Sequence, residues 1–73
     1  MAFQVYNIHL NNGMVIAVEE NYDIPFENGI VAKYKRIKDN DFLTLGDCIS
    51  GFIYVLKKNI AYISTGDVKV VSK

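Results

Sequence analysis

Residues 51–64, GFIYVLKKNIAYIS, constrain the fold of this chain more than any other stretch. Residues 52–56 and 60–63 are apolar at every position, and the polar tripeptide Lys57-Lys58-Asn59 separates them. A strand with two apolar faces is typical of one that is covered on both sides, or on one side and by a partner chain. The tripeptide allows either a hairpin or a 3₁₀ corner that passes the chain from one sheet to another.

The chain has 73 residues, which indicates a single domain spanning residues 1–73. A domain of this size buries only about 60% of its unfolded surface, so disulfides, metals or oligomerisation usually support it. One cysteine, Cys48, excludes an internal disulfide, and one histidine, His9, makes a structural zinc site in one chain improbable. We therefore expect a homo-oligomer.

The formal net charge is zero, but the two signs are separated along the chain. Residues 1–32 carry four acidic and no basic side chains, whereas residues 33–73 carry all eight basic side chains and four acidic ones. This asymmetry favours complementary subunit packing or a local anion site. The apolar runs are too short to span a membrane, and Met1–Gln4 lacks the basic start of a secretion signal, so a cytoplasmic protein is expected.

The first hairpin has the clearest local pattern. Residues 3–10 alternate so that Tyr6, Ile8 and Leu10 share one face, which predicts a half-buried strand with these side chains inward. Asn11-Asn12-Gly13 is a strong hairpin signal, because Asn and Gly accept positive φ at low cost. A second alternating strand follows over residues 14–20.

The rest of the chain predicts further strands. Residues 21–29 form a loop, and residues 30–37 fit a helix or a strand; the β-branched pair after Gly29 favours the strand. Residues 42–45 predict a short strand, and 65–67 a tight turn that folds residues 68–71 back on 60–63. The fold class expected is all-β: a small antiparallel barrel of five to six strands.

Two segments, Ile8-x-Leu10-x-x-Gly13-x-x-Ile16 and residues 54–60, give the chain a resemblance to the small SH3-like and Sm-like barrels. The first segment is similar to the opening of the first Sm motif, and the second lies where the second motif falls. The chain lacks the glycine that the family has soon after Ile16, and Lys57-Lys58 replaces its basic-glycine step. The resemblance implies an RNA-binding ring in which Phe26 and Asn28 face a pore, with Lys57 and Lys58 nearby.

The segment Lys33-Tyr34-Lys35-Arg36-Ile37-Lys38 is the strongest candidate for ligand binding. Its four cations bind phosphates well, and a tyrosine ring stacks on a base. A nucleotide or single-stranded RNA suits this set. The alternative is an edge strand whose lysines block aggregation; for Lys57 and Lys58 the alternative is a solvated corner.

Nothing in the sequence forms a catalytic constellation, and no cofactor or metal site is expected. His9 is interpreted as a sheet-face histidine and Cys48 as a small buried hydrophobic residue. The side chains of Glu19 and Glu20 point to opposite faces of a strand, which suits a solvated strand end better than a catalytic pair.

The expected function is that of a non-catalytic, homo-oligomeric binding module. It holds a small anionic ligand such as a nucleotide, or a protein target. A phage-type inhibitor or sequestering protein is one version of this hypothesis, and an Sm-like RNA-binding ring is the alternative.

Overall fold

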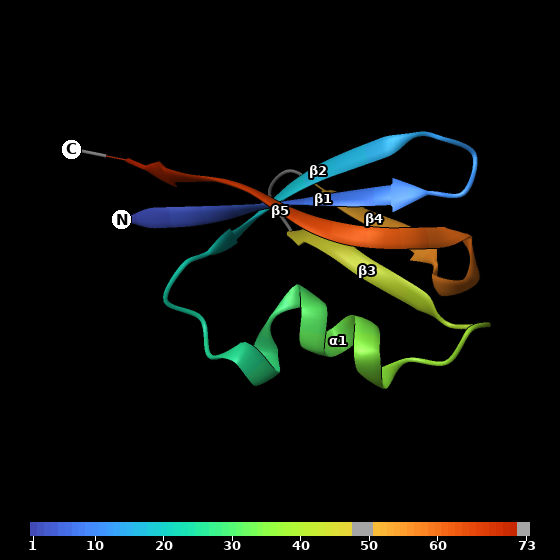
Figure 1. Cartoon of the computed structure of the whole chain (residues 1–73). Coiled ribbons are helices and arrows are strands. Elements are labelled where there is room, and N and C mark those ends of the chain that lie inside the picture. Colours follow the sequence, from blue (N-terminus) through green and yellow to red (C-terminus); the bar gives the residue numbers. More distant parts are fainter. Residues whose placement is uncertain (48–50, 72–73) are drawn as a thin grey trace.

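The chain forms two antiparallel sheets and a short helix in a computed structural model, which describes residues 1–47 and 51–71 (Figure 1). One sheet has the strand order β2-β1-β5 and the other pairs β3 with β4. The elements are β1 (Ala2–Leu10), β2 (Val15–Asn21), η1 (Phe26–Asn28), α1 (Ile30–Arg36), β3 (Phe42–Asp47), β4 (Gly51–Leu56), η2 (Lys57–Asn59) and β5 (Ile60–Val70). The all-β class is confirmed, but the described strands do not close into a barrel, because β2 and β3 are not paired.

The first hairpin is confirmed. β1 and β2 pair in register from Phe3 opposite Asn21 to His9 opposite Val15. The turn between them is closed by the N–H of Leu10, which donates to the Met14 carbonyl oxygen at 2.8 Å. Gly13 has a φ of 90°, which a residue with a side chain rarely adopts.

Residues 30–36 form the helix α1, so the strand expected over 30–37 is wrong. Ile30, Tyr34 and Ile37 recur at helical spacing, and all three pack against the core. In a strand, Ile37 would lie on the opposite face from Ile30 and Tyr34. The Glu20 Oε1 atom accepts a hydrogen bond from the Ile30 N–H at 2.8 Å and so caps the helix start. These tertiary contacts override the strand preference of the β-branched pair Ile30-Val31.

The turn expected at residues 65–67 is also wrong, because β5 runs through it and stays paired with β1. The pairing instead shifts register beside Gln4, which is the mark of a β-bulge. The Gln4 side-chain amide donates to the Gly66 carbonyl oxygen at 2.9 Å and holds the bulge. Residues 68–70 therefore extend the sheet beside β1 and do not fold back on residues 60–63.

The corner between the two sheets is the 3₁₀ turn η2, one of the two forms that the sequence allowed. Backbone hydrogen bonds anchor it on both sides. The Asn11 N–H donates to the Asn59 carbonyl oxygen at 2.9 Å, and the Lys57 N–H donates to the Asp41 carbonyl oxygen at 2.9 Å. The turn thus joins the first hairpin to the loop after α1.

The core lies between the two sheets and α1. Ile8 and Leu43 are its most deeply buried large side chains, and Tyr6 and Leu10 pack against it, so the inward face predicted for β1 is confirmed. Ile30, Leu45, Val55 and Ile60 complete the buried cluster. Cys48 lies outside the described residues. Within the described part of the chain, no helix is long and apolar enough to cross a membrane.

Candidate ligand-binding surface

The aromatic ring of Phe26 lies exposed on the turn η1, which leads into α1. Pro25 precedes the turn, and its carbonyl oxygen accepts a hydrogen bond of 2.9 Å from the Asn28 N–H. The next hydrogen bond of the turn is donated by the Gly29 N–H to the Phe26 carbonyl oxygen at 3.0 Å. The backbone is therefore held in a compact turn, while 66% of Phe26 remains exposed to solvent.

Two cations of α1 reach back to this turn. The Lys35 Nζ atom lies 5.9 Å from the centroid of the Phe26 ring, within the range of a cation–π contact. The Arg36 Nη1 atom donates to the Glu27 carbonyl oxygen at 2.7 Å, which leaves its other N–H groups for further partners. Among the described residues, the ion pair found is that of Lys69 with Glu19 on the three-stranded sheet. Neither Lys35 nor Arg36 therefore forms a salt bridge with a described carboxylate.

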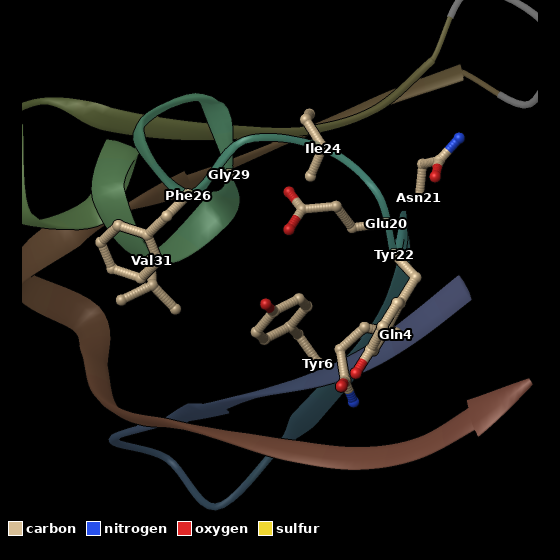
Figure 2. A pocket seen from close by; sticks show the side chains of 9 residues that line it. All are labelled: Gln4, Tyr6, Glu20, Asn21, Tyr22, Ile24, Phe26, Gly29 and Val31. Atoms are coloured by element: carbon tan, nitrogen blue, oxygen red, sulfur yellow. The ribbon is translucent and has the colours of Figure 1, made fainter. Parts of the chain in front are cut away.

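A cavity of about 200 Å³ opens beside the Phe26 ring, between the inner face of β1 and β2 and the loop to α1 (Figure 2). Figure 2 shows the Glu20 carboxylate and the Tyr6 hydroxyl directed into the space beside Phe26 and Val31. The lining residues are Gln4, Tyr6, Glu20, Asn21, Tyr22, Ile24, Phe26, Gly29 and Val31. The cavity thus combines aromatic walls with a carboxylate that can accept hydrogen bonds.

Tyr6 and Glu20 form the polar end of this cavity. Burial raises the pKa of Tyr6 above its ordinary value of 10.0, and the negative charge of Glu20, together with a hydrogen bond to it, raises it further. Tyr6 therefore stays a neutral hydrogen-bond donor at physiological pH. Glu20 is half-buried, whereas the side chain of Glu19 is exposed and bonds Lys69 at 2.7 Å.

The predicted opposite orientation of Glu19 and Glu20 is confirmed, but the solvated strand end predicted for both describes Glu19 alone. The alternation along β2 indicates an inward Glu20, because Glu20 shares a face with Ile16 and Val18. The site residues predicted from the sequence do not include Gln4, Tyr6, Glu20 or Tyr22, which line the cavity. The loop that carries Phe26 over these strands brings them together.

The C-terminal turn of α1 also carries Tyr34, a predicted site residue, and Lys57, another predicted site residue, lies against it. The Lys57 Nζ atom lies 4.8 Å from the centroid of the Tyr34 ring and donates to the Ile37 carbonyl oxygen at 2.6 Å. An ammonium at this position stabilises the helix C-terminus, where carbonyl oxygens lack partners. The fold thus brings Lys57 to Tyr34 and to the end of α1.

The remaining predicted residues lie around this helix. Lys33 is exposed on α1 and lines a groove toward β3. Lys38 lies in the following turn, where its N–H donates to Asp41 Oδ2 at 3.0 Å. The N–H of exposed Lys58 donates to the Asp39 carbonyl oxygen at 3.2 Å, and Asn28 is exposed on η1.

His9 lies on the outer face of the three-stranded sheet, remote from this surface. Its ring stacks on Tyr62 with centroids 4.0 Å apart, and its Nε2 atom lies 2.8 Å from the Ser64 hydroxyl. This position fits the sheet-face histidine expected from the sequence.

Comparison with known proteins adds no family to this description. No protein-family model matches the chain, and no curated protein and no solved structure is similar enough to match it.

Proposed function

We propose that this protein is a non-catalytic binding module that holds a nucleotide-like anion at Phe26, Lys35 and Arg36. One observation carries the proposal: an exposed aromatic ring lies beside the Lys35 ammonium, Arg36 bonds the backbone of the next residue along, and no described carboxylate neutralises either cation. A ring and unpaired cations recognise the two parts of a nucleotide, since bases stack on aromatic side chains and phosphates accept charge-assisted hydrogen bonds.

The cavity next to Phe26 favours a ligand with a base over a bare phosphate. A base stacked on Phe26 lies at its mouth, where the Glu20 carboxylate accepts hydrogen bonds from ring or amino N–H groups. Stacking contributes about 1–3 kcal/mol per base. The phosphate then lies toward Lys35 and Arg36, at a distance from the negative charge of Glu20.

Isothermal titration calorimetry with AMP, GMP, UMP and inorganic phosphate at low salt tests this proposal. We expect a mononucleotide to bind more tightly than phosphate, and Phe26→Ala and Lys35→Ala each to weaken binding about tenfold. Lys69→Ala removes a cation from β5, which does not line the cavity, and is the matched control. The absence of nucleotide binding, or binding that Phe26→Ala leaves unchanged, contradicts the proposal.

Single-stranded RNA held by an Sm-like ring is a second candidate. The observation in its favour is that Phe26 and Asn28 are both exposed on η1, where a strand of RNA passing along α1 also meets Lys33. A gel-shift assay with short oligo-U and oligo-A RNA separates the two candidates. A shift with RNA and no binding of mononucleotides favours the ring, and the reverse result favours the nucleotide module.

A further inference from the structure

The outer face of the β3–β4 hairpin is apolar and uncovered. Paired residues of an antiparallel sheet share a face, so the pair Leu43 and Val55 marks the face toward the core. The opposite face carries Phe42, Phe52 and Tyr54, which are 57%, 51% and 63% exposed. Residues 51–56 contain no charged residue that would keep this face in water.

The molecule as a whole exposes more surface than a monomer of its mass normally does. Its accessible surface is 5254 Å², whereas a folded monomer of 8.3 kDa has about 4,600 Å². The difference, about 650 Å², compares with the roughly 800 Å² that each partner buries in a standard interface. The excess belongs to the molecule as a whole, and it is similar in size to one partner's share of a standard interface.

A groove of about 290 Å³ runs along this face, between α1 and β3. Ile37, Phe42 and Phe52 make it apolar, Thr44 lies within it, and Lys33 lies at its rim. Tyr54 pairs directly with Thr44 across the hairpin and protrudes from the same face. One face thus carries both a protruding aromatic side chain and an apolar groove.

We propose that a second copy of this chain covers the face, with the two hairpins packed against each other about a twofold axis. A twofold interface must be self-complementary, because the same patch is used by both subunits. The Tyr54 side chain of each copy enters the groove of the other, and Lys33 at the rim offers a polar neighbour to its hydroxyl. Phe26, Lys35 and Arg36 are not part of this interface, so it stands independently of the nucleotide proposal.

Sedimentation velocity of the full chain tests the interface. The wild-type protein at about 100 µM, a concentration that populates a micromolar dimer, is expected to sediment at twice the chain mass of 8.3 kDa. Tyr54→Asp is expected to weaken self-association about 30-fold or more, as for an aromatic anchor at the centre of an interface. Tyr62→Asp is the matched control, since Tyr62 is 58% exposed on the other sheet.

Hydroxyl-radical footprinting of the wild-type protein gives a second test that needs no substitution. We expect Tyr54 to be modified several-fold more slowly in concentrated than in dilute solution, and Tyr62 to be modified at the same rate in both. A monomer at about 100 µM, an assembly that survives Tyr54→Asp, or protection of Tyr54 only when a different protein is added overturns the proposal.

Discussion

The carboxylate of Glu20 accepts a hydrogen bond of 2.8 Å from the backbone N–H of Ile30. The end of β2 is thereby joined to the first turn of α1, across a loop that includes Phe26. Gly29 lies against this contact, since a Cβ atom built there would be 3.0 Å from Glu20 Oε2. One side chain thus positions the helix, the loop and the wall of the candidate ligand cavity.

Glu20→Ala is expected to destabilise the protein by about 1–2 kcal/mol, because the Ile30 N–H loses its partner at the helix start. The midpoint of urea unfolding measures this loss. Glu19→Ala, at the neighbouring position on the exposed face, is the control and should change the midpoint little. Equal losses for the two variants would show that the cap does not position α1.

Tyr6 makes the stability depend on pH in alkaline solution. Its pKa is raised in the folded state, so the unfolded chain loses the phenol proton first. The contribution of Tyr6 is therefore complete below its unfolded value of 10.0 and is lost as the pH rises from there through the folded value. Tyr6→Phe should flatten this decline in urea midpoints measured between about pH 8 and about pH 11. A decline of the same steepness in Tyr6→Phe would assign it to other groups.

Lys57→Ala is expected to cost about 1–2 kcal/mol, since the ammonium both bonds the Ile37 carbonyl oxygen and lies over the Tyr34 ring. Thermal unfolding followed by circular dichroism measures the change. Lys58→Ala is the matched control, because Lys58 makes its hydrogen bonds at this corner through backbone atoms, which the substitution keeps. Equal melting temperatures for the two variants would show that the Lys57 ammonium does not stabilise the fold and is free to bind a ligand.

Two glycines with positive φ should respond differently to alanine. At Gly46, with a φ of 100°, a Cβ atom would collide with the Gly51 carbonyl oxygen, so Gly46→Ala should cost roughly 2–4 kcal/mol. At Gly13, with a φ of 90°, a Cβ atom meets open space, so only the backbone strain of about 1 kcal/mol applies. The two melting temperatures distinguish these costs. A Gly46→Ala protein as stable as Gly13→Ala would contradict the close approach of Gly46 to the Gly51 carbonyl oxygen.

Local pattern was sufficient for some elements. The alternation over residues 3–10 and the Asn11-Asn12-Gly13 turn predict β1, β2 and their hairpin, because strand period and turn chemistry act over a few residues. The polar break at residues 57–59 likewise marks a corner. The candidate site was predicted only in part. Phe26, Lys35 and Arg36 were recognisable as residue types, but their convergence depends on α1 being a helix that reaches back to η1.

By itself, the sequence determined the inward face of β1, the turn at residues 11–13 and the corner at residues 57–59, since these follow from neighbouring residues. Only the tertiary structure decided that residues 30–36 are helical and that β5 continues through Gly66. In both cases a distant partner settles a choice that local propensity leaves nearly even: Glu20 and the core for α1, and the full length of β1 for β5. The cavity between Tyr6, Glu20 and Phe26 exists for the same reason, because it is lined by segments that meet only after folding.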